Sequence, residues 1–289
     1  MRCLRAVTVG SQTQVGNLTA GAPLPVEAVQ ANHLALATRN ANNLRFGYDV
    51  EASVRFVLKH TLPLRGRVLD IGTGKGRFVI PLARHLSKVT TVDISAREQR
   101  MARLEATHAG VADRIDFVLA DAGALPWPAG SFDAVTSWNV FHHLDDPERV
   151  FNELVRVLKP GGKLVLADFS PAGFRIIDTI HAAEGRRHPH PPSRFSHWCA
   201  GLRQRGFVVN RFVSCHQEML VARCPRHGTP EYGQPCPHAD TSNHSRTIPS
   251  ALQFRPIHQR SCTVAAWLPR SISLRPAAFF PRASVSNIN

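Results

Sequence analysis

The sequence lacks any run approaching the roughly 20 consecutive apolar residues that a membrane helix needs. It also lacks an apolar leader after Arg2 and Arg5, and its six cysteines include no Cys-x-x-Cys pair. These absences argue against a membrane span, a disulfide framework and a zinc site. We therefore expect a cytoplasmic protein with free thiols and no membrane span.

Acidic residues are scarce, and the formal net charge is +14 over 289 residues. The first 45 residues carry +3 and residues 226–289 carry +5, so much of the excess lies near the two ends. This charge is not interleaved with aromatic residues in the way a base-stacking surface would be. We do not expect nucleic acid as the partner, and nothing in the sequence indicates an oligomeric state.

The sequence pattern changes twice along the chain, which predicts three parts. Residues 1–43 have weak periodicity apart from the helix-like stretch "VEAVQANHLALATRN", and we expect low order there. From 44 to 224, short β-branched runs alternate with helical periodicity, which is typical of an α/β domain. Residues 225–289 are rich in proline, arginine and serine without periodicity, so we expect a disordered basic tail.

Seven strands are predicted in the middle part, and they imply a mostly parallel sheet with helices on both faces. They are "RVLDIG", "KVTTVDI", "IDFVLAD", "FDAVTSW", "GKLVLADF", "FVVNRFV" and "EMLVAR". The last two follow each other with no helix between them, which predicts an antiparallel hairpin. Right-handed crossovers are expected between the earlier strands. Ser95 and Asp146 are predicted to cap the helices after the second and fourth strands.

The first strand runs into a glycine-rich turn in "VLDIGTGKGRF", residues 68–78. A phosphate-binding P-loop is excluded, because Leu69 stands where its first glycine is needed and Gly76 where its Ser or Thr is needed. A dinucleotide turn, Gly-x-Gly-x-x-Gly, fits poorly, because the third glycine position falls on Arg77 or Val79. Neither common phosphate cradle explains the turn.

The remaining pattern is one acid followed by glycines at alternate positions: Asp70, Gly72, Gly74 and Gly76. Glycines let the backbone approach a ligand closely and adopt positive φ. A carboxylate here disfavours phosphate but can accept from a cationic amino group. A ligand with an ammonium group and a neutral nucleoside is therefore expected, with Lys75 facing solvent.

The next two strands also end in acids. Asp93 is placed to bind both hydroxyls of a ribose, and Ile94 beside it to pack on a purine face. Asp121 is placed to accept from an adenine amino group, and the backbone N–H of Ala122 to meet a ring nitrogen. Three acids at three successive strand ends are difficult to explain by core packing.

With these motifs in order, the chain resembles the class I S-adenosylmethionine-dependent methyltransferases, in the subgroup that includes the ubiquinone and menaquinone C-methyltransferases. The motifs are "VLDIGTGKG", "VDIS", "ADAGALPWPAGSFDAVTS" and "FHHLDDPERVFNELVRVLKPGGKLVLADFS", within residues 54–223. The resemblance implies a Rossmann-like three-layer sandwich whose seven-stranded sheet has its last strand antiparallel. It also implies S-adenosylmethionine as cofactor and methyl transfer as the activity, with Asp70 near the methionine moiety.

Methyl transfer from a sulfonium depends mainly on positioning, and a general base is needed only when the acceptor must lose a proton. His142 and His143 follow the fourth strand and are the candidate bases. The alternative for either one is that it caps the strand-to-helix loop and hydrogen-bonds its backbone. Asn139 is a candidate contact for the amino-acid end of the cofactor. Residues 45–48 are predicted either to form a lid or to pack on the first helix.

The acceptor is expected to be a small molecule, because the motifs of amino-methylating nucleic-acid enzymes and a cytosine-C5 cysteine are absent after the fourth strand. Residues 170–193 are predicted to determine acceptor specificity. We expect no metal, since the local candidates share no regular face: His181, Glu184, His188, His190 and His197. Two alternatives stay open: a catalytically silent binding or scaffold protein, and a nucleic-acid methyltransferase recruited by the basic tails.

Overall fold

The computed structural model of the chain describes residues 16–17, 24–187 and 195–226. The predicted tail from 227 onward and most of residues 1–23 lie outside this description. The division of the chain at residues 43 and 224 stays a prediction.

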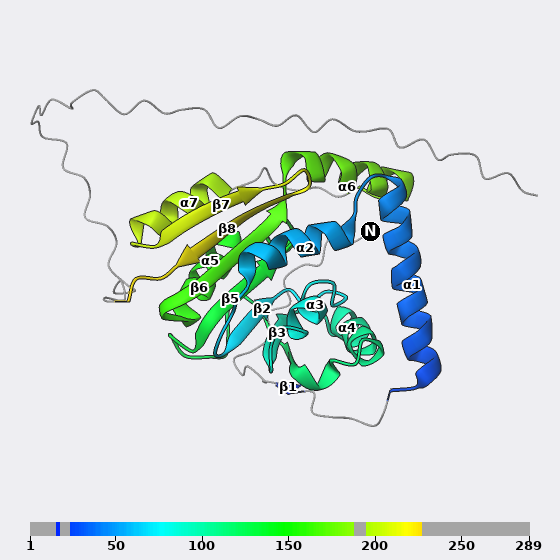
Figure 1. Cartoon of the computed structure of the whole chain (residues 1–289), viewed down its shortest axis with the longest axis horizontal. Coiled ribbons are helices and arrows are strands. Elements are labelled where there is room, and N and C mark those ends of the chain that lie inside the picture. The colour runs from blue at the N-terminus through cyan, green and yellow to red at the C-terminus, as the bar shows by residue number, and fades with distance from the viewer. Residues whose placement is uncertain (1–15, 18–23, 188–194, 227–289) are drawn as a thin grey trace, which may run out of the picture. The chain divides into compact units, whose positions relative to one another are not determined.

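One twisted sheet organises the described residues, with strand order β1-β4-β3-β2-β5-β6-β8-β7 (Figure 1). The pairs among β2 to β6 are parallel, and β8 runs antiparallel to both β6 and β7. The predicted seven-stranded sheet with its last strand antiparallel is confirmed, and β1 adds a two-residue antiparallel pairing on β4. The strands are β1 (Gly16–Asn17), β2 (Val68–Ile71), β3 (Val89–Asp93), β4 (Ile115–Leu119), β5 (Phe132–Trp138), β6 (Leu158–Phe169), β7 (Val208–Val213) and β8 (Gln217–Arg223).

Helices connect and cover these strands, and their starts follow the local signals in the sequence. Ser95 accepts from the backbone N–H of Glu98, and Asp146 accepts from that of Arg149, as expected for N-caps. The helices are α1 (Val26–Arg45), α2 (Val50–Thr61), α3 (Val79–Ala83), α4 (Ala96–His108), α5 (Pro147–Val157), α6 (Pro171–Ala183) and α7 (Phe195–Gln204), with 3₁₀ turns η1 (Ala112–Arg114) and η2 (Phe141–His143).

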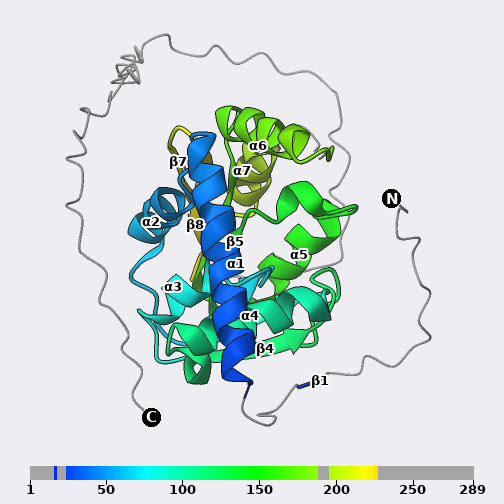
Figure 2. The ribbon, with the colours of Figure 1, turned by 90° about the vertical axis from the view of Figure 1, so that its right-hand side faces the viewer.

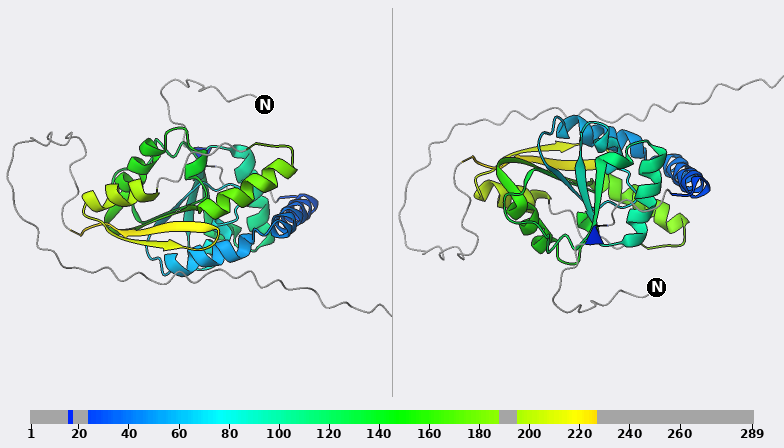
Figure 3. Two further views of the ribbon diagram at one scale, coloured as in Figure 1. Left: turned by 90° about the horizontal axis from the view of Figure 1, so that it is seen from above. Right: turned by 90° about the horizontal axis from the view of Figure 1, so that it is seen from below.

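The sheet is packed on both faces, as the sequence predicts. Helices α2, α3 and α4 bury apolar side chains with one face of the sheet. Helices α5 and α7 do so with the other, where Leu154, Phe151 and Trp198 share one cluster. Figure 3 shows the strands edge-on between these two groups of helices. This is the three-layer sandwich expected from the alternation of strand and helix patterns.

Helix α1 begins within the segment for which we expected low order, and it packs across α4 (Figure 2). Part of the contact is polar: the amide of Asn32 donates to the carbonyl of Met101 and to Glu105 Oε2, both at 3.2 Å. His33 Nδ1 lies 2.9 Å from Glu105 Oε1. Because polar side chains contribute to this interface, hydrophobic periodicity alone could not reveal these contacts.

Among the residues that the structure describes, no helix combines the length and the apolar character that crossing a bilayer requires. The cytoplasmic location stays a prediction.

Replacing Leu154 by alanine is expected to lower the free energy of unfolding by about 2–5 kcal/mol, because this side chain is fully buried between α5 and the sheet. Urea denaturation followed by circular dichroism measures the change. The control is Leu34→Ala on α1, where 68% of the residue is exposed and a change within about 0.5 kcal/mol is expected. Equal effects of the two substitutions would contradict the assigned core.

Candidate active site

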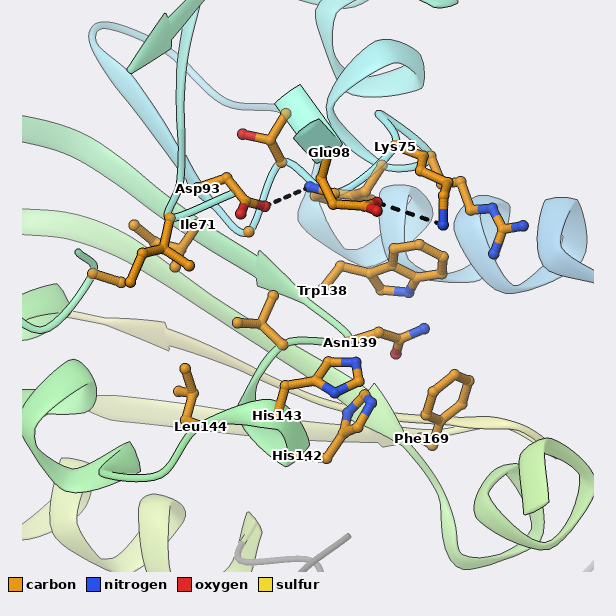
Figure 4. Close-up of a pocket in the computed structure, with 18 of the residues that line it drawn as sticks. Ile71, Lys75, Asp93, Glu98, Trp138, Asn139, His142, His143, Leu144 and Phe169 are labelled. Atoms are coloured by element: carbon orange, nitrogen blue, oxygen red, sulfur yellow. Dashed lines mark hydrogen bonds and ion pairs between the residues drawn. The ribbon is translucent and has the colours of Figure 1, made fainter. Parts of the chain in front are cut away.

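A cavity of about 570 Å³ lies at the carboxyl ends of the central parallel strands. It lies where the strand order reverses, since β2 connects onward to β3 on one side and pairs with β5 on the other. Open α/β sheets bind ligands at such a reversal, because the two adjacent crossovers leave on opposite faces and open a crevice. Figure 4 shows side chains from several of these strand ends converging on the cavity.

The three glycines of the turn have positive φ but meet different surroundings. A Cβ on Gly72 would lie 2.2 Å from Val140 Cγ2, so this glycine permits the turn after β2 to approach the loop after β5 closely. A Cβ on Gly74 would meet no atom within 4 Å, because that direction is open space. Gly76 does not line the cavity, and a Cβ there would lie 2.5 Å from Ile80 Cδ1 in α3. Gly72 and Gly74 border the cavity, whereas Gly76 allows helix packing.

Asp70 lies beneath the turn instead of in the cavity lining. Its Oδ1 accepts from Thr136 Oγ1 at 2.8 Å and its Oδ2 from Thr91 Oγ1 at 3.0 Å. Burial raises the pKa of this carboxyl to about 7, although both hydroxyl donors act in the opposite direction. In this structure Asp70 supports the turn from below, so a direct contact with the methionine moiety stays a prediction.

Asp93 and Ile94 both line the cavity at the end of β3. Asp93 Oδ2 accepts from the backbone N–H of Gly74 at 2.8 Å, and Oδ1 accepts from that of Ser95 at 2.8 Å. The carboxylate therefore ties β3 to the glycine turn and is held in one orientation. Ile94 is 77% exposed, which leaves an apolar surface at the mouth of the cavity.

Asp121 and Ala122 line the same side of the cavity after β4. Asp121 Oδ1 accepts from the backbone N–H of Gly123 at 2.8 Å, and Oδ2 lies 3.3 Å from Arg149 Nη2. The carboxylate is half-exposed and keeps lone pairs available toward the cavity.

Asn139 follows β5 and has φ of 56°, the one positive φ outside glycine among the described residues. Its Nδ2 donates to Tyr48 Oη at 3.4 Å, while Oδ1 is buried and has no hydrogen-bond partner in the described part of the chain. A buried acceptor without a hydrogen bond costs free energy, which a ligand that donates to it would recover. The position fits the predicted contact with a cationic amino group.

The two candidate bases come from η2, and both line the cavity. His142 is buried, and its Nδ1 lies 2.6 Å from Asp168 Oδ1. The backbone N–H of His142 donates to Asp168 Oδ2 at 3.1 Å, so one carboxylate binds both the backbone and the ring of this residue. The ring of His143 lies 3.9 Å from that of His142 between centroids.

Sequence reasoning missed Asp168, although its signal was present. It stands at the carboxyl end of β6 in "LADF", as Asp70, Asp93 and Asp121 stand at or near the ends of their strands. The pairing with His142 joins residues 26 positions apart and could not be read from either motif alone.

Tyr48 is buried against Phe169 in the cavity wall. Of the two predicted roles, its position in this structure fits packing and not a lid. Burial raises the pKa of Tyr48 to about 12, which keeps the phenol neutral.

Lys75 was expected to face solvent, and this was wrong. It lines the cavity beside Arg77, and its Nζ lies 3.5 Å from Glu98 Oε2 because α4 brings that carboxylate to the turn (Figure 4).

The far wall of the cavity is built by α6 and the end of β6. Ile177 and Ile180 pack with Phe169 in a separate apolar cluster and line the cavity. These residues lie in or next to the segment 170–193 predicted to determine specificity, of which 188–194 are outside the described residues. Within the described ranges, no group of His, Cys, Asp and Glu is arranged to hold a metal ion.

Residues 69–166 match the family model described as a methyltransferase domain. This part of the chain thus resembles a methyltransferase domain. It is 42% identical over 133 residues to a 27-O-demethylrifamycin SV methyltransferase of Amycolatopsis mediterranei, covering 43% of this chain and 49% of the relative. It is 38% identical over 130 residues to a demethylmenaquinone methyltransferase of Thermus thermophilus, covering 44% and 58%. The chain thus spans about half the length of the curated relatives it matches.

The fold of this domain also occurs in a crystal structure of the PH0226 protein from Pyrococcus horikoshii. The likeness has a TM-score of 0.50 at 20% identity and covers 60% of this chain and 89% of the other. The predicted family and its cofactor, S-adenosylmethionine, agree with the family match over residues 69–166. The cavity fits this cofactor chemically: a buried amide oxygen at Asn139 suits its ammonium group, and the exposed Ile94 suits its purine.

Replacing Asp70 by asparagine is expected to change how stability depends on pH. The folded protein binds the Asp70 proton more tightly than the unfolded chain, whose pKa is about 3.9. This group's stabilising contribution is therefore complete below pH about 4 and is lost as pH rises to about 7. The neutral amide cannot ionise, so the free energy of unfolding of Asp70→Asn should fall less than that of the parent between pH 5 and pH 8. The two losses should differ by at least about 1 kcal/mol. Urea denaturation at both pH values measures this, and parallel profiles would contradict the raised pKa.

Proposed function

We propose that this protein is an S-adenosylmethionine-dependent methyltransferase that acts on a small-molecule acceptor. The observation that carries the proposal is that His142, which is paired with the buried Asp168, lines the same cavity as the glycine turn and Asp93. One cavity therefore holds both a nucleoside-binding side and a proton-accepting side. When bound, S-adenosylmethionine supplies a methyl group activated by a sulfonium sulfur.

On the cofactor side, each proposed contact follows from the chemistry of the group present. Asp93, oriented by two backbone N–H groups, accepts from the ribose hydroxyls. Ile94 packs on the purine, while Asp121 and the backbone of Ala122 bind the adenine edge. Gly72 and Gly74 let the turn approach the ligand.

On the acceptor side, His142 is the proposed general base. Asp168 accepts a hydrogen bond from Nδ1–H of His142, which fixes the tautomer of the ring and makes Nε2 the basic nitrogen. Nε2 would accept the proton that an acceptor hydroxyl or activated carbon must lose, while S-adenosylmethionine would supply the methyl group and leave as S-adenosylhomocysteine. His143 beside it is the second candidate for this role, and the remaining contribution of the chain is alignment and exclusion of water.

The chemistry of the cavity wall supports a small acceptor with an apolar body. Phe169, Ile177 and Ile180 provide that surface, and α6 is our proposed specificity segment. The named relatives, a demethylrifamycin methyltransferase and a demethylmenaquinone methyltransferase, favour a small molecule over nucleic acid.

Asp93→Ala and Gly74→Val are each expected to abolish measurable binding of S-adenosylmethionine. The first removes the ribose acceptor, and the second puts a β-branched side chain at φ of 47° in the open space beside the turn. Isothermal titration calorimetry measures the affinity, and circular dichroism checks that the variants fold. Asp116→Ala, an exposed acid paired with Lys88 away from the cavity, is the matched control and should bind as the parent does. Unchanged affinity in both site variants would overturn the assigned cofactor site.

His142→Gln and Asp168→Asn are expected to lower turnover by about 100- to 10,000-fold, with cofactor affinity within about threefold of the parent, because general-base catalysis contributes on this scale. The assay is transfer of a labelled methyl group to a panel of phenols, aliphatic hydroxyls and quinols. Asp168→Asn should also change the pH profile of kcat, since it alters the tautomer preference of His142. The matched variant is His143→Gln, and a larger loss there would move the base to that residue.

The same panel separates the alternatives. Cofactor binding without transfer to any acceptor would favour a silent binding protein. Transfer to RNA or DNA that falls steeply with salt, and is lost when residues 225–289 are deleted, would favour recruitment by the tail.

A further inference from the structure

Two arginines from separate parts of the chain meet at the rim of the cavity. Arg39 lies on α1 and Arg186 follows the end of α6, and both line the cavity and are partly exposed. Both guanidiniums contact the same carboxylate oxygen: Arg39 Nη2 lies 3.7 Å from Glu184 Oε2, and Arg186 Nη2 donates a hydrogen bond to it. Figure 1 shows α6 reaching α1 there. One carboxylate neutralises only one of the two cations, so this pair of arginines keeps a net positive charge.

The position of Arg186 is set by the way in which α6 ends. Gly185 has φ of 67°, and its backbone N–H donates to the carbonyl of Ala182 at 3.0 Å. The backbone N–H of Arg186 donates to the carbonyl of His181 at 2.8 Å. These two bonds form a Schellman motif, which stops a helix and satisfies its last carbonyls. Arg186 is therefore anchored to the same helix end as His181, which also lines the cavity.

The positive charge of the two arginines reaches the wall of the cavity. Burial lowers the pKa of His181, and the charges of Arg186 and Arg39 lower it further. Within the described ranges, no acid of α1 or α6 lines the cavity, and the acids that do line it come from β3, α4 and the loop after β4. The side built by α1 and α6 therefore combines cations with apolar surface.

Helix α6 presents the apolar surface and the charge in succession along its length. Ile177 and Ile180 lie one turn apart, pack with Phe169 and line the cavity. Seven positions separate Ile177 from Glu184, which corresponds to about 10 Å along a helix axis. Two fused aromatic rings with a substituent at each end have a comparable length.

We propose that the methyl acceptor carries a carboxylate or phosphate group, which Arg39 and Arg186 bind at the rim while its apolar body packs on α6. This inference rests on the proposed function and deepens it by naming the chemical class of the acceptor. A guanidinium has five N–H donors in a fork that fits such anions, so the contact with Glu184 leaves donors for a second anion. A neutral acceptor forgoes this attraction, and the rim thereby distinguishes the two.

The test compares acids with their amides, which differ by one charge on the same scaffold: 6-hydroxy-2-naphthoate and its amide, and 4-hydroxycinnamate and its amide. Titration calorimetry uses the full chain saturated with S-adenosylhomocysteine. At least one acid should bind about 5- to 20-fold more tightly than its amide at low salt, and this preference should shrink at high salt. Comparing 2-naphthyl phosphate with 6-hydroxy-2-naphthoate tells phosphate from carboxylate.

Arg39→Met and Arg186→Met should each weaken binding of the preferred acid by about 3- to 10-fold, because each removes one of the two cations. Affinities for its amide and for S-adenosylhomocysteine should stay within about twofold. Arg39→Lys keeps the charge and should recover part of the loss. The matched control is Arg55→Met on α2, since this exposed arginine is also paired, with Asp49 and Glu51, but does not line the cavity. It should bind every ligand as the parent does.

Equal weakening of acid and amide by the two arginine variants would mean a structural role and overturn the inference. Weakening of S-adenosylhomocysteine in place of the acid would assign the arginines to the cofactor and overturn it as well. A parent that binds S-adenosylhomocysteine but prefers neither acid over its amide would overturn the anionic acceptor and leave the proposed function intact. Failure of the parent to bind S-adenosylhomocysteine would overturn the proposed function itself.

Discussion

The site depends on the buried carboxyl of Asp70, which connects three neighbouring strands just below the ligand cavity. Thr91 from β3 and Thr136 from β5 donate to its two oxygens, and Asp70 itself lies on β2. Thr73 in the turn lies 2.9 Å from Thr91, between hydroxyl oxygens. The glycine turn therefore rests on a polar network inside an otherwise apolar sheet, and such networks specify one arrangement when every member has a partner.

Above this network the cavity has two sides with different physical origins. The cofactor side is built from strand ends and short turns, where backbone N–H groups hold the carboxylates of Asp93 and Asp121. The far side is built from helices α1 and α6 and from Tyr48, which reach over the sheet from separate parts of the chain. A rigid cofactor side combined with a wall of helical side chains allows one fold to serve different acceptors.

The strands and the order of the motifs could be predicted because their signals are local. β-Branched runs, caps and glycine spacing each act over a few residues, so Asp93, Ile94, Asp121, Ala122 and Asn139 could be assigned to strand ends, and the structure brings them to one cavity. Helix α1 was predicted only as a helix-like stretch in a segment of low order, and part of its packing on α4 comes from polar contacts of Asn32 and His33. Such contacts leave no hydrophobic period in the sequence.

By itself the sequence determined the sheet and its antiparallel last strand, since these follow from periodicity, and its motifs resemble those of a family whose cofactor is S-adenosylmethionine. Only the tertiary structure decided that Asp70 lies beneath the turn, that Asp168 holds His142, and that Lys75 meets Glu98 while Arg77 meets no carboxylate in the described chain. Each of these depends on side chains from different strands or helices meeting at one edge of the sheet. Because these residues are far apart along the chain, no local sequence pattern indicates which of them meet. Only the packed fold decides their contacts.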